Sequence, residues 1–214
     1  MIQTIKKTKT LENNEIVLLE TKNSNYDKKI LIIGVFHGEE PQGEYLINEF
    51  LKTDLSKIKN KLYIIPCLNP DGKNKNQRQN SRGIDLNRNF PTKNWKITTK
   101  KEYFGGTEPA SEIETKFMVE ILNEHKFDAI LSIHAPFKIV NYDGPAEEIA
   151  KEISKITGYP IQGDIGYPTP GSFGNYAGVE RNIPTITLEL PEDESNTTLW
   201  ETNKAVFEYF SNKI

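Results

Sequence analysis

Four side chains of the kinds that bind metals or carry protons lie at the ends of short apolar segments. They are His37 and Glu40 after residues 30–36, His134 after residues 128–133, and Glu189 near the end of residues 185–190. Apolar runs of this length, bounded by turn residues, predict buried strands. In open α/β sheets, ligands bind at the carboxyl ends of the strands. We therefore expect these side chains to meet at one edge of a sheet.

The residue types in this group predict a metal centre. His37 and Glu40 are three residues apart and can face the same point, where His134 adds a second imidazole. Two histidines and a carboxylate form a ligand set of catalytic Zn²⁺, which lowers the pKa of a water and polarises a carbonyl. Glu189 is then available to transfer the proton. Two structural alternatives stay open here: His134 as a hydrogen-bonded histidine at the sheet edge, and Glu189 as an ion-pair partner.

The segment 73–88 is locally basic in a chain whose net charge is -3. Against one acid, Asp85, it holds five cationic side chains: Lys73, Lys75, Arg78, Arg82 and Arg88. Such a local positive field suits an anionic substrate, and the guanidinium fork of arginine binds a carboxylate through two hydrogen bonds. A solvated basic loop is the alternative interpretation.

Composition excludes several classes of protein. The sequence pI of about 5.8 disfavours a globally basic nucleic-acid binder. The single cysteine, Cys67, excludes a disulfide within the chain and a cysteine-based zinc site. The longest apolar run, residues 30–36, is far too short to span a membrane. Because we see no secretory signal at the N-terminus, we expect a cytoplasmic protein with neither nucleic-acid nor membrane partners.

Strands alternate with helical patterns along the chain. We expect strands at 16–19, 30–36, 62–68, 128–133 and 185–190. We expect helices at 42–52 and 146–157, a helix that runs from a Ser111-x-x-Glu114 capping box to about residue 126, and a last helix capped by Ser195. At 214 residues the chain predicts one domain, residues 1–214. The expected fold class is α/β, with a mixed central β-sheet and helices on both faces.

The order of the motifs resembles a known family. The strings are His37-x-x-Glu40, Gly83-Ile84-Asp85-Leu86-Asn87-Arg88-Asn89-Phe90, Leu131-Ser132-Ile133-His134 and Thr187-Leu188-Glu189. In this order they resemble the zinc metallocarboxypeptidases, and the match covers roughly residues 30 to 190. The resemblance implies a zinc-carboxypeptidase-like fold, a metallopeptidase activity and one Zn²⁺ per chain.

The resemblance also implies a role for each matching residue. By this resemblance, the zinc ligands are His37, Glu40 and His134, and Glu189 is the general base and acid. Arg78 stabilises the oxyanion, and Asn87 and Arg88 bind the substrate's terminal carboxylate. Tyr167 is the tyrosine on a loop over the site.

A narrower set of strings resembles one group within the family, the murein peptide amidases. They are Asn69-Pro70-Asp71-Gly72, Leu86-Asn87-Arg88-Asn89-Phe90-Pro91 and Gly166-Tyr167-x-Thr169-Pro170-Gly171-Ser172-Phe173-Gly174. Members of that group release meso-diaminopimelate from the γ-D-glutamyl bond of cell-wall tripeptide, in the cytoplasm, during peptidoglycan recycling. The resemblance implies a small peptide substrate with a free carboxylate. The distal zwitterion of diaminopimelate needs an acid and donors, for which Asp143, Asp164 and Arg82 are candidates.

Three alternatives remain at this stage. An ordinary carboxypeptidase acting on α-linked peptides would share every catalytic residue. A deacylase of the aspartoacylase or succinylglutamate desuccinylase type also uses His-x-x-Glu with a later histidine, but it does not predict Tyr167 at this spacing. A catalytically inactive binding module should have lost Glu189 or a metal ligand, and both are present. The sequence does not determine the oligomeric state.

Overall fold

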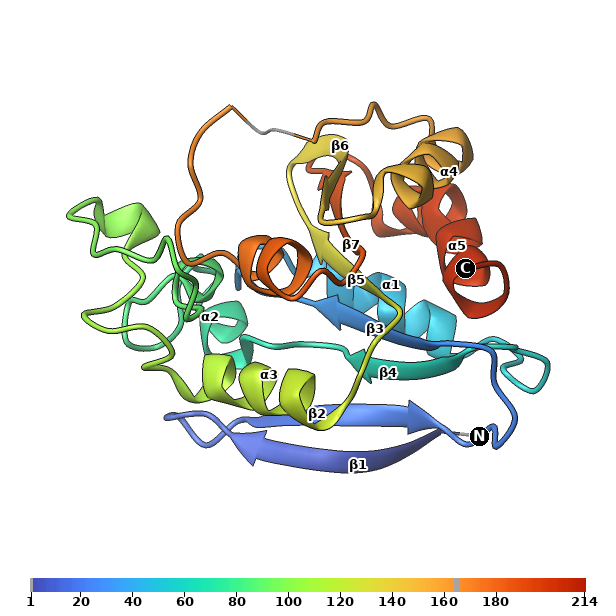
Figure 1. The fold of residues 1–214 in the computed structure, drawn as a ribbon, viewed down its shortest axis with the longest axis horizontal. Helices are drawn as coiled ribbons and strands as arrows, with labels where there is room; N and C mark the ends of the chain where they lie inside the picture. The colour runs from blue at the N-terminus through green and yellow to red at the C-terminus, as the bar shows by residue number, and fades with distance from the viewer. Residues whose placement is uncertain (1, 164–165) are drawn as a thin grey trace.

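The computed structural model describes residues 2–163 and 166–214. Across these residues the strands form one seven-stranded sheet in the order β1-β2-β4-β3-β5-β7-β6 (Figure 1). Its strands are β1 (Ile2–Lys9), β2 (Glu15–Thr21), β3 (Lys29–Gly34), β4 (Lys61–Ile65), β5 (Ala129–His134), β6 (Phe137–Asp143) and β7 (Thr185–Pro191). The four strands β4, β3, β5 and β7 run parallel, and β1, β2 and β6 are antiparallel to their neighbours. The sheet is therefore mixed, as predicted.

The central strands owe their position to their apolar composition. All six residues of β5 are buried, and in β3 only the first residue, Lys29, is partly exposed. Strands that are covered on both faces lack the alternation of apolar and polar residues that marks a half-exposed strand. β3 and β5 are parallel neighbours in the centre of the sheet, so their carboxyl ends lie side by side.

Helices cover both faces of the sheet, as the sequence predicted. One face packs against α1 (Gln42–Leu51), α4 (Glu147–Thr157) and α5 (Asn196–Asn212). The other face packs against α3 (Ile113–Glu124) and the short π-helical segment η3 (Gly174–Glu180). The second layer also holds α2 (Pro70–Asn74) near the ends of the strands (Figure 1). No helix of the described residues is both long and apolar enough to cross a membrane.

The structure corrects two local predictions. Strands β1 and β6 were not predicted from the apolar pattern, because they lie at the two edges of the sheet and carry many partly or fully exposed residues. The capping box at Ser111 is wrong, because α3 begins at Ile113 and its N-cap, Glu112, makes no side-chain capping bond. The Ser111 hydroxyl instead donates to Glu112 and accepts a hydrogen bond from Asn89. The Ser195 cap is confirmed, since its hydroxyl accepts from the backbone N–H of Thr198.

Candidate active site

The three residues expected to bind metal converge at the carboxyl ends of β3 and β5. His37 and Glu40 lie in the turn that follows β3, and His134 is the last residue of β5. The Nδ1 atom of His37 lies 2.7 Å from Oε1 of Glu40, and Nδ1 of His134 lies 3.0 Å from Oε2 of the same carboxylate. All three side chains are buried. Burial alone would raise the pKa of Glu40, but the two histidines hold it well below its usual range.

A fourth residue, Asp85, holds the outer side of His37. Its Oδ1 lies 3.3 Å from Nε2 of His37, and the same carboxylate caps the 3₁₀ turn η1 (Leu86–Arg88) by accepting from the backbone N–H of Asn87. Burial opposes a charge on His37, yet Glu40 and Asp85 together raise its pKa to about 9. The motif spacing alone predicts no role for Asp85. The signal was available, because Asp85 is the only acid in the basic segment.

Arg78 closes this end of the site. Its Nε and Nη2 atoms each lie 3.0 Å from Oδ2 of Asp85, and its Nη1 lies 3.4 Å from Nδ1 of His37. The guanidinium also lies over the ring of Tyr103, 5.4 Å from its centroid. A cation held between a carboxylate and an aromatic face has a fixed position. Arg78 therefore presents positive charge beside the metal-ligand group.

Glu189 lies next to His134 across the sheet, because β5 and β7 pair these two residues in register. Its Oε2 atom is buried without a hydrogen-bond partner among the described residues. Burial raises the pKa of Glu189, although the nearby His134 opposes the shift. A partly buried carboxylate with a raised pKa and an unbonded oxygen is suited to accept and return a proton.

The facing wall of the site carries Asn87, Arg88 and Tyr167. The side-chain oxygen of Asn87 accepts from the backbone N–H of Phe173 at 2.8 Å, which fixes the amide. Arg88 lies over the ring of Tyr103, 5.5 Å from the centroid, so Tyr103 contacts both arginines. The side chain of Tyr167 is 42% exposed, with its ring 6.5 Å from that of Tyr103.

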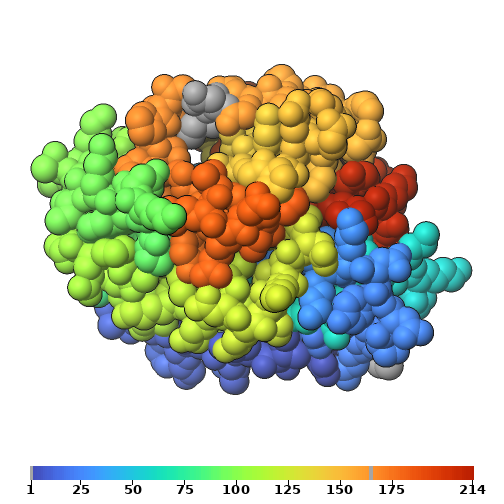
Figure 2. Space-filling model, viewed as in Figure 1, coloured from blue at the N-terminus to red at the C-terminus, as the bar shows by residue number. Residues whose placement is uncertain are grey.

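Arg88 is also held through its backbone. The indole N–H of Trp95 donates to the carbonyl of Arg88 at 3.1 Å. A Cβ atom at Gly105 or at Gly171 would lie only 2.2 Å from that carbonyl oxygen, so both positions require glycine. The segments around residues 90 and 171 are joined by a hydrogen bond from the N–H of Phe90 to the carbonyl of Gly171. In Figure 2 the green loop and the orange η3 segment accordingly pack side by side.

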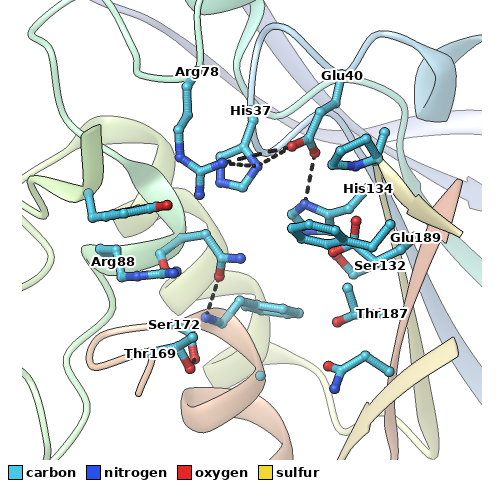
Figure 3. Close-up of a pocket in the computed structure, with 18 of the residues that line it drawn as sticks. His37, Glu40, Arg78, Arg88, Ser132, His134, Thr169, Ser172, Thr187 and Glu189 are labelled. Carbon is cyan, nitrogen blue, oxygen red and sulfur yellow. Dashed lines mark hydrogen bonds and ion pairs between the residues drawn. The ribbon is translucent and has the colours of Figure 1, made fainter. Parts of the chain in front are cut away.

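All of the predicted site residues line one cavity of about 290 Å³. They are His37, Glu40, Arg78, Asn87, Arg88, His134, Tyr167 and Glu189. Figure 3 shows Arg78, His37 and Glu40 at one end of this cavity, and Ser132 and Thr187 extending away from them along the strands. Ser132, Thr187, Asn141 and Asp143 were not predicted as parts of the catalytic site. Alternation along a strand could have found the first of them, since Ser132 is two residues before His134.

Only part of the basic segment faces the cavity. Arg78 and Arg88 line it, whereas the other three cations are paired elsewhere: Lys73 with Glu44, Lys75 with Glu12 and Arg82 with Glu112. The expected positive field is therefore narrower than the sequence suggested. Of the candidates for a distal zwitterion, Asp143 lines the cavity, Arg82 does not, and Asp164 lies outside the described residues.

The donor set fits a catalytic zinc ion. One ligand atom from each of His37, Glu40 and His134 lies within 4.8 Å of the others. Two imidazoles and one carboxylate are typical of catalytic zinc sites. The contact between Asp85 and the second nitrogen of His37 is the outer-shell carboxylate that commonly orients a metal-binding histidine.

Comparison with known proteins defines the class. Residues 1–148 match the family model of the zinc carboxypeptidases. The chain therefore belongs to the zinc carboxypeptidase family, a zinc-dependent class of peptidases, and is a hydrolase. The matched segment contains the metal-ligand group, Arg78, Asn87 and Arg88, and it ends before Tyr167 and Glu189.

Individual relatives narrow the resemblance. The chain is 29% identical to murein peptide amidase A of Escherichia coli (strain K12) over 178 residues, which cover 78% of this chain and 72% of the relative. It is 33% identical to murein peptide amidase A of Vibrio campbellii over 149 residues, covering 64% and 59%. Less than two thirds of the Vibrio protein's length is thus matched.

Solved structures show the same fold. The murein-tripeptide amidase of Escherichia coli O157 superposes with a TM-score of 0.83 at 25% identity, over 95% of this chain and 89% of that one. Carboxypeptidase A of Helicoverpa armigera superposes with a TM-score of 0.77 at 17% identity, over 97% and 66%. The predicted zinc-carboxypeptidase-like fold is confirmed.

Proposed function

We propose that this chain hydrolyses the amide between γ-D-glutamate and meso-diaminopimelate in the murein tripeptide L-alanyl-γ-D-glutamyl-meso-diaminopimelate. The reaction would serve peptidoglycan recycling in the cytoplasm, with residues 1–214 as one catalytic domain. The observation that carries the proposal is that all the expected site residues line one cavity. The similarity to murein peptide amidases supports the choice of substrate.

In this proposal His37, Glu40 and His134 hold one Zn²⁺ per chain. When bound, the ion supplies Lewis acidity, which makes a water nucleophilic near neutral pH and polarises the scissile carbonyl. Asp85 keeps the imidazole of His37 oriented through its second nitrogen. The ligands need no large rearrangement, because both histidines already direct Nδ1 toward Glu40.

The remaining residues act on the substrate. Asn87 and Arg88 hold the terminal carboxylate, and Tyr167 lies over the same end of the peptide. Holding the substrate at a fixed distance from the reacting centre removes much of the entropic part of the barrier. Arg78 places its charge where the oxyanion develops. Glu189 takes the proton from the attacking water and returns it to the leaving amine.

Product release from the tripeptide tests the proposal directly. Metal-loaded and chelator-treated protein are incubated with L-alanyl-γ-D-glutamyl-meso-diaminopimelate and, separately, with an α-linked dipeptide, and the products are identified by mass spectrometry. We expect diaminopimelate from the metal-loaded protein alone. Cleavage of only the α-linked peptide would make the chain an ordinary carboxypeptidase. Cleavage of neither would favour the deacylase or a binding role.

A further inference from the structure

Tyr103 contacts both arginines of the catalytic cavity and has no role in the proposed mechanism. Its ring centroid lies 5.4 Å from the guanidinium carbon of Arg78 and 5.5 Å from that of Arg88. Both distances fall within the ~6 Å at which the negative face of an aromatic ring attracts a cation. Figure 3 shows the two arginines on the same side of the cavity, across from Ser132 and Thr187. One ring is therefore shared by the two cations that line this wall.

Arg88 depends on this ring more than Arg78 does. Arg78 is paired with Asp85, whose Oδ2 lies 3.0 Å from its Nη2. Arg88 has no ion pair in the described part of the chain, and its Nη1 donates to the carbonyl of Asn87 at 2.6 Å. Two guanidiniums at one ring also repel each other, and the ring face offsets part of that repulsion. Without the ring, the Arg88 guanidinium would lose the contact that holds it near Arg78.

Tyr103 is held in place through the backbone around it. It is the last residue of the 3₁₀ turn η2 (Lys101–Tyr103). The side-chain amide of Gln79 donates to two carbonyls of this turn, at 2.9 and 3.3 Å. The backbone N–H of Asp85 donates to the carbonyl of Phe104 at 2.8 Å. The position of the ring is therefore set by the segment 78–88, which also carries both arginines.

Tyr167 approaches the same ring. The centroids of the two tyrosine rings are 6.5 Å apart, within the range of interacting aromatic pairs. Arg88, Tyr103 and Tyr167 line a second cavity of about 360 Å³ as well as the catalytic one. These three side chains therefore form the wall between the two cavities, and Tyr103 contacts the other two.

The ring of Tyr103, and not its hydroxyl, makes these contacts. The hydroxyl has no hydrogen bond to another of the described residues. The ring face carries the partial negative charge that attracts cations. Phenylalanine has the same ring face, whereas leucine fills a similar space without it. Substitution by these two residues therefore separates the attraction for the arginines from simple packing.

We propose that Tyr103 is a positioning residue that holds Arg78 and Arg88 at a fixed separation through the face of its ring. This inference rests on the proposed function, which assigns the oxyanion to Arg78 and the terminal carboxylate to Arg88. In such a substrate, a fixed number of backbone bonds separates the scissile carbonyl from that carboxylate. A fixed separation of the two arginines matches this constant distance, so Tyr103 couples substrate binding to the chemical step.

The test measures kcat and KM of Tyr103→Leu and Tyr103→Phe on L-alanyl-γ-D-glutamyl-meso-diaminopimelate. Tyr103→Leu should lower kcat about 10-fold, because Arg78 is displaced from the oxyanion, and raise KM about 10-fold, because Arg88 is displaced from the carboxylate. Tyr103→Phe should keep both constants within about threefold of the wild type. Bound zinc should be unchanged in both variants, because Tyr103 is not in the metal-ligand group.

A tripeptide whose terminal carboxylate is amidated separates the two effects. With this substrate, Tyr103→Leu should still lower kcat about 10-fold but should leave KM within about twofold of the wild type, because Arg88 has no carboxylate to bind. A merely structural role would change both constants in the same way on both substrates, and that result would reject the inference.

Tyr26→Leu is the matched control, because the ring of Tyr26 also faces two cations. Its centroid lies 5.9 Å from Nζ of Lys29 and 5.3 Å from Nζ of Lys61, outside the catalytic cavity. This variant should keep the wild-type kcat and KM. Wild-type constants in Tyr103→Leu, or equal losses in Tyr103→Leu and Tyr103→Phe, would overturn the inference.

A double-mutant cycle measures the coupling between the two arginines. Arg78→Lys and Arg88→Lys are made singly and together, in the wild-type protein and in Tyr103→Leu. In the wild type, where one ring holds both side chains, their losses in kcat/KM should deviate from a simple product by about fivefold or more. In Tyr103→Leu the losses should multiply. Losses that multiply in both proteins would show that the ring does not couple the arginines.

The proposed function and this inference fail in different ways. If the γ-linked tripeptide is not cleaved, the same variants are measured on the α-linked dipeptide. A loss in Tyr103→Leu that is absent from Tyr103→Phe would then keep the inference and reject the proposed function. Cleavage of the tripeptide by Tyr103→Leu at the wild-type rate would do the opposite.

Discussion

Asp85 and Asp143 are carboxylates at opposite ends of one site, and they differ in what surrounds them. Asp85 is fully buried, lies 3.0 Å from Arg78 and faces His37, and these charges hold its pKa well below the usual range against the effect of burial. Asp143 faces no cation among the described residues, and burial raises its pKa to about 6.

The difference indicates which end of the site is complete in the protein alone. At the Asp85 end, the protein supplies partners for its own charges, so the geometry is fixed before substrate arrives. At the Asp143 end, the carboxylate faces no cation and the Ser132 hydroxyl has no hydrogen-bond partner among the described residues. Local violations of good packing and pairing are expected at functional sites. Three substitutions test this difference between the two ends of the site.

The largest effect is expected at Glu189, which lies between the two ends. Glu189→Gln keeps the shape of the side chain but removes the proton acceptor, so kcat should fall by about 100- to 10,000-fold. Bound zinc, measured by elemental analysis, should be unchanged because Glu189 is not in the ligand group. Glu194→Gln, an acid paired with Lys138 outside the cavity, is the control. Turnover near the wild-type rate in Glu189→Gln would contradict the mechanism.

The next effect is expected at Asp85. Asp85→Asn removes the charge that orients His37 and neutralises Arg78, so zinc affinity should fall by about 10- to 100-fold in competition with a chelator. The unfolding free energy of the metal-free protein should fall by about 3 kcal/mol, because a buried charge pair loses one partner. Asp54→Asn, an exposed aspartate, should change neither quantity. Unchanged zinc affinity would show that Asp85 does not support the metal site.

The smallest effect is expected at Asp143, where the substitution should increase the unfolding free energy instead of lowering it. Its pKa is raised from 3.8 to about 6, so the folded state favours the protonated acid. The stability from this group is present below about pH 4 and is lost as the pH rises through 6. Above that pH, Asp143→Asn should be more stable than the wild type by about 1–2 kcal/mol, allowing for partial exposure. Denaturant unfolding at pH 4 and pH 8 measures the difference in unfolding free energy between the variant and the wild type. A wild type that is more stable than Asp143→Asn at pH 8 would contradict the prediction.

Much of the catalytic end could be predicted from the sequence because its residues follow fully buried strands. Runs such as 30–36 are apolar on both faces, so their ends can be located, and the side chains just beyond them must lie at the sheet edge. The helices on both faces followed from similar patterns. The capping box failed because the Ser111 hydroxyl bonds to the side chains of Asn89 and Glu112, and the N-cap of the helix is Glu112.

The far end of the cavity could not be located in the same way, although the resemblance had offered Asp143 as a candidate. The sequence Phe137–Asp143 mixes apolar and polar residues, since β6 is an edge strand with part of its surface exposed. The position of Asp143 in the cavity depends on the register of β6 against β7, which local sequence does not encode. Arg82 was a candidate because it is close in sequence to the expected site, but its side chain faces Glu112 and does not line the cavity.

The position of β6 at the end of the sheet has a consequence for how such enzymes diversify. Because β6 is the edge strand, a substitution at one of its cavity-lining residues leaves the pairing of β3, β5 and β7 intact. Side chains that line the far end of the cavity can therefore change by single mutations while the reacting groups stay fixed. The edge strand is therefore the part of this sheet where the cavity lining can vary without disturbing the metal-ligand group, so directed evolution can begin at alternate positions of this one strand.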